Sequence, residues 1–176
     1  MRVVCRRAVA SDAGNLVELI KSAYRGKISR RGWTSEADFV EGDRIDTDQV
    51  LSMIDSGNSC FLVLEQAEEI VGCCHLQNRG EGNAYFGTFS VRPTLQGRGL
   101  GDHLLGEAER EASAAYGAAE LEIAVLGQQE KLIEWYERRG FRRTGDTQPF
   151  PADGKFARPL RDDLYFVILK KKLRRM

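Results

Sequence analysis

Three alternating glycines stand where the sequence predicts the start of a long helix. Gly97, Gly99 and Gly101 follow an apolar strand-like segment and precede a helical repeat of leucines and alanines. Glycine lets the backbone approach a ligand closely and adopt dihedral angles that other residues avoid. A helix N-terminus adds unpaired N–H groups and the positive end of the helix dipole. The segment therefore predicts an anion site, most naturally for a phosphate or pyrophosphate.

The residues around these glycines argue against two common phosphate-binding motifs. A P-loop needs Lys and then Ser or Thr after its last glycine, whereas Asp102 and His103 follow Gly101. A dinucleotide-binding motif needs a glycine at 102 or 104, where the sequence has Asp102 and Leu104, and a βαβ unit where it has a strand meander. ATP chemistry of the Walker type is excluded and NAD is disfavoured. A glycine-rich turn that only starts a helix stays an alternative.

The segment over 96–101, QGRGLG, resembles the signature Q/R-x-x-G-x-G/A that follows the fourth strand in the GNAT superfamily of acyl-CoA-dependent N-acetyltransferases, and it fits at every fixed position. The resemblance implies that acetyl-CoA is the cofactor and that backbone amides of this loop hold its pyrophosphate. The cofactor-binding residues implied here are Gln96, Gly97, Arg98, Gly99, Leu100, Gly101 and Asp102.

Two further segments belong to the cofactor side of this resemblance. The main chain of Phe89, Ser90 and Val91, beside a bulge in the fourth strand, would pair with the pantetheine arm and polarise the acetyl carbonyl. The family often has Asn seven residues before a later tyrosine, where this chain has Gln129. Glutamine hydrogen-bonds as asparagine does but is longer, so Gln129 is a cofactor ligand only by this looser match.

A tyrosine in the segment over 132–141, LIEWYERRGF, supplies a candidate catalytic acid. The segment looks like the family's helix after the fifth strand, in which a tyrosine precedes a Gly-Phe pair by four residues. Tyr136, Gly140 and Phe141 fit this pattern. The attacking amine expels CoA as a thiolate, and a phenol of pKa ~10 is still protonated when a thiol of pKa ~8.5 leaves as its anion. Tyr136 is therefore the expected proton donor; the alternative is that it only packs against the cofactor.

The acceptor side is much less defined by the sequence. A protonated amine needs a base or a water chain to remove a proton before attack. The candidate residues are Trp33 as an aromatic wall and, as base or cation anchor, Glu36, Asp38, Glu41, Asp43 and Glu122, although each carboxylate could equally be a solvated surface charge. The run over 144–163 reads as an excursion between the last two strands, which in this family helps to form the acceptor site. His75 and His103 are expected to be structural.

The order of the predicted elements matches the same family. Strands are expected over 1–9, 60–66, 70–78, 84–91, 120–126, from 141 and over 164–171, with helices up to about 24–26 and over 48–55, 100–116 and 130–139. Ser11-Asp12 and Thr47 are expected to cap the first two helices, and 27–46 to be an irregular loop. The expectation is an α+β (three-layer α/β) fold with a mixed, mostly antiparallel sheet of about seven strands and about four helices, as one domain over 1–176.

Composition limits the class of protein further. The chain has 176 residues, 42% of them hydrophobic, and its 26 basic and 26 acidic residues cancel. Because no net field favours nucleic acid or an anionic membrane, we expect neither as a partner, and the basic end KKKLRRM is expected to be solvated. No apolar run reaches the ~20 residues that span a bilayer. The four cysteines show no metal-like C-x-x-C spacing, so we expect no metal and a cytoplasmic location.

These observations predict an N-acetyltransferase that transfers acetyl from acetyl-CoA to a primary amine, by direct attack in a ternary complex. The acceptor is a small-molecule or peptide amine that the sequence does not specify. Dimers are common among proteins that look like this one, so a homodimer stays open. The alternative function is a non-catalytic acyl-CoA sensor or regulatory protein on the same fold.

Overall fold

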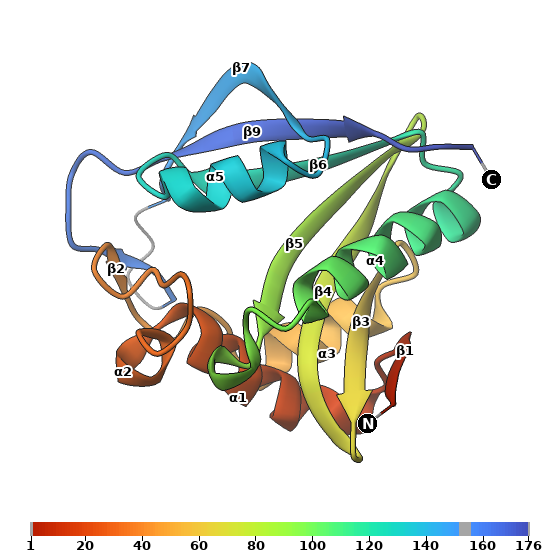
Figure 1. Ribbon diagram of the computed structural model, residues 1–176, viewed down its shortest axis with the longest axis horizontal. Helices are drawn as coiled ribbons and strands as arrows, with labels where there is room; N and C mark the ends of the chain where they lie inside the picture. Colours follow the sequence, from red (N-terminus) through yellow and green to blue (C-terminus); the bar gives the residue numbers. More distant parts are fainter. Residues whose placement is uncertain (1, 152–155, 176) are drawn as a thin grey trace.

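A mixed seven-stranded sheet forms the centre of the molecule, in the order β1-β3-β4-β5-β6-β9-β7 (Figure 1). The computed structural model describes residues 2–151 and 156–175. Neighbouring strands are antiparallel except for β5 and β6, which are parallel. The strands are β1 (Val3–Arg7), β2 (Val40–Glu41), β3 (Ser59–Gln66), β4 (Glu69–Gly80), β5 (Asn83–Val91), β6 (Glu120–Leu126), β7 (Arg142–Pro149), β8 (Arg158–Pro159) and β9 (Tyr165–Lys172).

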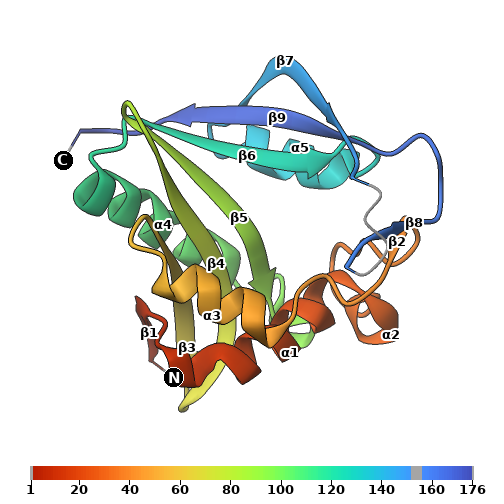
Figure 2. The ribbon, with the colours of Figure 1, turned by 180° about the vertical axis from the view of Figure 1, so that it is seen from behind.

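Helices cover both faces of this sheet and give the expected three layers. On one face, α1 (Ala13–Tyr24) and α3 (Thr47–Asp55) pack on β3 to β5, which Figure 2 shows from that side. On the other face lie α4 (Leu100–Tyr116) and α5 (Glu130–Glu137). The short α2 (Gly26–Ser29) follows α1, and single turns of 3₁₀ helix cover Ala10–Asp12 and Pro93–Leu95.

The helices form because each has one apolar face that the sheet buries. In α4, Leu104, Ala108 and Ala112 recur at helical spacing and are fully buried against the β-sheet. In α1, Leu16 and Ile20 do the same against the opposite face, where they meet Phe61 and Val63 of β3. The alternating side chains of β3 thus contribute to both cores.

Several local expectations are corrected by the structure. The cap of α3 is Asp46 and not Thr47. The Asp46 carboxylate accepts a hydrogen bond from the Gln49 N–H at 2.9 Å, and the Asp46 N–H donates to the Gln49 side-chain oxygen. The predicted excursion over 144–163 begins later, since β7 continues to Pro149. The later part of the excursion contains β8, and the predicted loop over 27–46 contains β2. These two short strands pair with each other. Residues 152–155 of that excursion lie outside the described part.

The sheet opens between β5 and β6. Both strands are fully described, and their pairing covers only three residue pairs, from Asn83–Glu120 to Tyr85–Glu122. Beyond that point the register of β5 against β4 also shifts, because His75 pairs with Gly87 but Cys73 pairs with Ser90. Thr88, at a φ of 50°, sits in this bulge. The two strands therefore diverge where the bulge turns the β5 main chain.

Candidate active site

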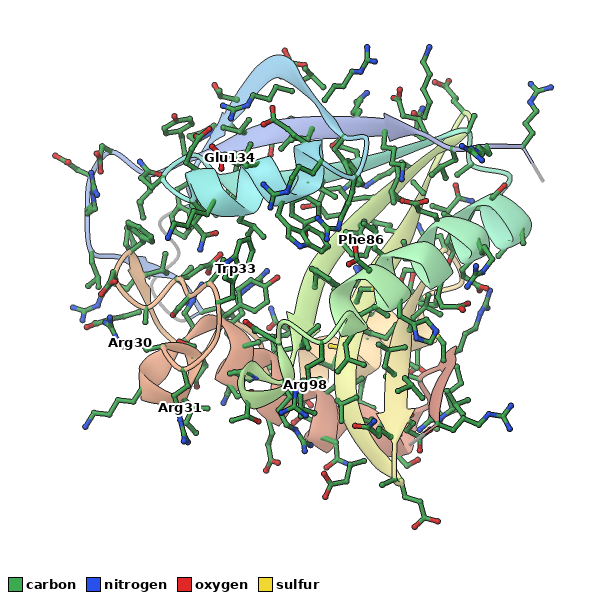
Figure 3. The ribbon with its side chains drawn as sticks, in the orientation of Figure 1. Arg30, Arg31, Trp33, Phe86, Arg98 and Glu134 are labelled. Carbon is green, nitrogen blue, oxygen red and sulfur yellow. The ribbon has the colours of Figure 1, made fainter. Side chains whose placement is uncertain are left out.

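A cavity of about 450 Å³ lies where β5 and β6 diverge. Its walls come from segments far apart in the sequence: the C-terminal end of α1, the loop over 33–36, the end of β5, the glycine turn (residues 96–102) and α5. We call this cavity the cleft. In Figure 3, Trp33 lies on the inner side of its loop, between α5 and the turn that carries Arg98, whereas Arg30 and Arg31 extend outward.

The glycine turn has the backbone shape that an anion site requires. Gly97 and Gly99 have φ values of 76° and 81°, and a side chain at either position would meet no atom within 4 Å. Gly99 caps α4, and the first α4 hydrogen bond is donated by the N–H of His103 to its carbonyl at 3.0 Å. The N–H groups of Leu100, Gly101 and Asp102 therefore have no partner within the helix. These groups and the open turn fit a pyrophosphate.

Other predicted residues of the turn hold it in place. Gln96 donates to the carbonyl of Val91 at 3.1 Å and accepts from the N–H of Trp33, so it joins the end of β5 to the loop over 33–36. A Cβ at Gly101 would lie 3.3 Å from Phe89, which shows that α4 approaches this ring closely. Leu100 is buried in the core, whereas Arg98 is exposed and does not line the cleft.

Asp102 and Arg139 connect the start of α4 to the end of α5. The Arg139 guanidinium donates to the Asp102 carboxylate at 3.0 Å, and this hydrogen bond lowers the pKa of Asp102. The same guanidinium lies 3.6 Å from the centre of the Trp135 ring. Both Asp102 and Arg139 line the cleft. The pair therefore fixes the two helices beside the turn, a role that the sequence analysis did not find.

The three predicted residues at the end of β5 point in different directions. Phe89 and Val91 line the cleft, but the side chain of Ser90 is 1% exposed and donates to the Thr88 carbonyl at 3.3 Å. Thr88 and Phe89 have no residue opposite them on β4. Since β6 has already diverged, Thr88 and Phe89 have no residue opposite them on either neighbouring strand.

Tyr136 lies in the cleft among other aromatic side chains. It is 4% exposed, and its ring centre is 5.1 Å from that of Trp135, 5.4 Å from Phe141 and 6.3 Å from Phe89. Burial raises its pKa well above the ordinary value, and the neighbouring Tyr24 adds to the rise. The Tyr136 phenol therefore keeps its proton at any pH near neutrality and can donate it.

The structure brings some of the predicted acceptor residues to the cleft and not others. Trp33, Glu36 and Gln129 line it, and Gln129 donates to the Ser35 carbonyl at 3.2 Å. Asp38 is exposed and paired with Arg30. Glu122 lies on β6 with Lys170 3.7 Å away, Glu41 pairs with Arg158, and Asp43 lies 3.6 Å from Lys21. Glu36 is thus the one of these carboxylates that lines the described cleft.

Tyr24 is a residue of the cleft that the sequence analysis missed, and Arg44 of the predicted loop over 27–46 lies beside it. Tyr24 ends α1 and lines the cleft, and the Arg44 guanidinium carbon lies 4.7 Å from the centre of its ring. Burial raises the pKa of Tyr24. An aromatic residue at the predicted end of the first helix was the available signal. Among the described residues, no group of three or more His, Cys, Asp and Glu is placed to hold a metal ion. None of the described helices is long and apolar enough to cross a membrane.

Comparisons with known proteins agree with this geometry. Residues 19–141 match the model of a family described as the acetyltransferase (GNAT) family. No curated protein matches the chain. Among solved structures, the chain is similar to the PaiA N-acetyltransferase from Thermoplasma acidophilum in complex with coenzyme A, at 19% identity and a TM-score of 0.74 over 98% of this chain and 99% of that one.

Two other solved structures share the fold. One is the IAA acetyltransferase from Bacillus cereus, at 17% identity and a TM-score of 0.69, covering 98% of this chain and 100% of that one. The other is yncA from Salmonella typhimurium with its cofactor acetyl-CoA, at 20% identity and a TM-score of 0.70, covering 100% and 96%. The likeness extends over the whole sheet and its helices.

Proposed function

Because this chain belongs to the acetyltransferase (GNAT) family and its acyl donor is acetyl-CoA, we propose that it acetylates a primary amine by direct attack within a ternary complex. The observation that carries the proposal is that one cleft holds both the glycine turn and the Tyr136 phenol. Bound acetyl-CoA supplies an acetyl group activated as a thioester. The nitrogen–carbon bond forms as the carbon–sulfur bond breaks, the amine loses a proton and the sulfur gains one.

The glycine turn is proposed to hold the pyrophosphate. The three free N–H groups at the start of α4 point out of the helix end, and the helix dipole favours a negative charge there. Gly97 and Gly99 supply a turn that no side chain fills. The Asp102 carboxylate lies near this site, but its negative charge is balanced by the ion pair with Arg139.

The bulge of β5 is proposed to position the acetyl group. Phe89 has no residue opposite it in the register of β4, and its main-chain N–H is the donor that we assign to the carbonyl oxygen of the acetyl group. A fixed N–H in a site from which water is excluded stabilises negative charge that develops on that oxygen. Phe89 and Trp135, whose rings lie 5.8 Å apart, give this part of the cleft an apolar lining.

Tyr136 is proposed as the proton donor to the departing sulfur. Its place in the cleft supports this role: it is protonated when the thiolate forms, as a donor has to be, while its burial also makes it a weaker acid than a phenol in water. Glu36 is the proposed acceptor of the amine proton, directly or through water, since it lines the same cleft. Arg25 holds its carboxylate, with Arg25 Nη2 3.1 Å from Glu36 Oε2.

Thermal unfolding with acetyl-CoA, CoA, ATP and NAD in parallel tests the donor site first. At 100 times Kd a ligand of the native state adds about 2.7 kcal/mol, or about 5–10 °C in Tm for a chain of this size. We expect this shift with acetyl-CoA and CoA only. Thiol release from acetyl-CoA across a panel of primary amines then tests transfer. Binding without release for any amine would contradict the catalytic proposal and favour an acyl-CoA sensor.

A further inference from the structure

A second cavity, also of about 450 Å³, lies on the α1 and α3 side of the sheet. The elements around it, seen from that side in Figure 2, are α3, the start of β3, the middle of β4 and β5 up to its bulge. Its charged lining consists of Arg44 and Arg79, and the described residues that line it include no carboxylate. The other lining residues are Ser52, Met53, Ser56, Ser59, His75, Gln77, Tyr85, Gly87 and Thr88.

Neither guanidinium has a carboxylate within ion-pair distance in the described part of the chain, although the charge of Glu36 helps to raise the pKa of Arg44. Each instead lies over an aromatic ring: Arg44 over Tyr24 at 4.7 Å, and Arg79 over Tyr85 at 4.6 Å with a hydrogen bond of 2.9 Å to Gln77. An arginine held on a ring keeps N–H donors in its plane for an anion. Each guanidinium therefore keeps its positive charge and has N–H donors beyond those used by Tyr24 and Gln77.

His75 gives a second, independent sign of a ligand. It lines the second cavity and is 7% exposed, yet its Nε2 atom is buried and forms no hydrogen bond within the described residues. A buried polar atom without a partner costs free energy, so such an atom in a cavity wall indicates a missing partner. An anionic oxygen between the arginines would give Nε2–H an acceptor.

The second cavity and the cleft share two walls. One is the contact between Tyr24, which lines the cleft, and Arg44, which lines the second cavity. The other is the bulge of β5, where Thr88 faces the second cavity and Phe89 faces the cleft. The two cavities are therefore adjacent, with no lining residue in common among those described, and an acceptor that reaches both has to pass the Tyr24–Arg44 contact or the bulge.

We propose that the second cavity binds the carboxylate of the acceptor, so that the acceptor is an amine that also carries a carboxylate. The planar carboxylate matches the guanidinium fork of Arg44 and Arg79. Charge also orients such a zwitterion, because Arg44 and Arg79 repel its ammonium group from the second cavity. This inference rests on the proposed function and adds the class of substrate to it.

Matched pairs of acceptors test the proposal. Thiol release from acetyl-CoA is measured with a series of amino acids of increasing length, each compared with its uncharged carboxamide. We expect kcat/KM for at least one acid to exceed that of its carboxamide about tenfold or more, as a charged hydrogen bond contributes. Equal rates for acids and carboxamides across the series would overturn the proposal while leaving acetyl transfer intact.

Arginine variants test whether the second cavity causes the preference for acids over carboxamides. Arg44→Gln and Arg79→Gln are each expected to lower the ratio between acid and carboxamide toward one. Arg110→Gln is the matched control, because Arg110 is an exposed α4 residue that pairs with Glu107 and lines neither cavity. A ratio that both cavity variants leave unchanged would overturn the proposal.

A binding measurement separates this proposal from a failure of the proposed function. The chain has two histidines, so the ring signals of His75 and of exposed His103 can be compared by NMR while acetate is titrated into the protein with CoA bound. We expect acetate to shift the His75 signals and raise its pKa, and the double variant Arg44→Gln/Arg79→Gln to abolish both effects. No response of His75 would overturn the proposal even if no amine is acetylated.

Discussion

Arg25 and Glu36 form a buried ion pair that joins the residue after α1 to the loop beside the cleft. The Arg25 Nε donates to the Glu36 carboxylate at 3.2 Å, and both side chains are about nine-tenths buried. Arg25 also donates to the carbonyls of Glu41 at 3.2 Å and of Phe156 at 3.0 Å. One guanidinium thus holds together the segments on both sides of the β2–β8 pair.

Replacing Arg25 is expected to cost stability as well as activity. Arg25→Met leaves the Glu36 carboxylate buried without its partner, which costs about 3–5 kcal/mol. Urea unfolding measures this loss. Arg30→Met is the control, because it breaks the exposed pair with Asp38 and should cost about 1 kcal/mol or less. Similar losses for the two variants would show that burial does not determine the contribution of Arg25. Adding Glu36→Gln to Arg25→Met should recover part of the stability.

Tyr136→Phe should lower turnover without weakening the binding of acetyl-CoA. The hydroxyl is removed and the ring that packs on Phe141 is kept, so we expect kcat to fall about 100-fold and Kd to change little. Single-turnover kinetics and calorimetry give the two values. Tyr116→Phe serves as control, since Tyr116 does not line the cleft. Unchanged turnover in Tyr136→Phe would remove the proposed role as acid.

Alanine substitutions of Gly97 in the glycine turn and of Gly106 in α4 are expected to have opposite effects on stability. Gly97→Ala forces alanine into a left-handed backbone at a φ of 76°, so it should destabilise by about 1–2 kcal/mol and weaken binding of CoA. Gly106→Ala lies within α4, where the added methyl group meets no atom within 4 Å, and should stabilise by about 0.5–1 kcal/mol. Unfolding and CoA binding are measured for both. Equal CoA affinity in Gly97→Ala and the natural chain would contradict the turn's proposed role.

The buried imidazole of His75 predicts a loss of stability in weak acid. Burial, helped by the charge of Arg79, lowers its pKa from 6.5 to about 4. The unfolded chain therefore binds a proton more readily than the native one, and the stability is present above pH 6.5 and falls between about pH 6.5 and pH 4. The contribution is about 3 kcal/mol. Urea midpoints across this range, compared with those of His75→Gln, measure it; parallel curves for the two proteins would contradict it.

Sequence patterns predicted the elements whose burial alternates or repeats. The strand expected over 120–126 is β6, and the helix expected over 100–116 is α4. Sequence patterns did not predict elements that lack such a repeat. Every residue of β7 is exposed, so the strand carries no alternation and the sequence predicts only its first residues, before the excursion expected from 144. The pairs Val40–Pro159 and Glu41–Arg158 join residues more than a hundred positions apart, which local sequence does not record.

The same distinction holds for the site. The glycine turn could be predicted because Gly97 and Gly99 meet a local backbone requirement that only glycine meets easily. Arg44 and Arg79 could not, because an arginine that faces a cavity has the same side chain as one in solvent. Arg44 lies in the loop before α3 and Arg79 on β4, so their meeting at one cavity depends on the folded chain.

Because the sheet opens between β5 and β6, we expect the alignment of the glycine turn with Tyr136 to depend on the volume of the side chains packed between the two parts of the sheet. Three residue pairs join the two parts of the sheet, with the turn on one part and Tyr136 on the other. Beyond those pairs, the angle between the parts depends on how Phe89 packs against Trp135 and Tyr136. A misplacement of about 1 Å can lower a rate about 100-fold. We therefore expect the size of the apolar ring at Phe89 or Trp135 to affect the rate of acetyl transfer as well as the polar groups do.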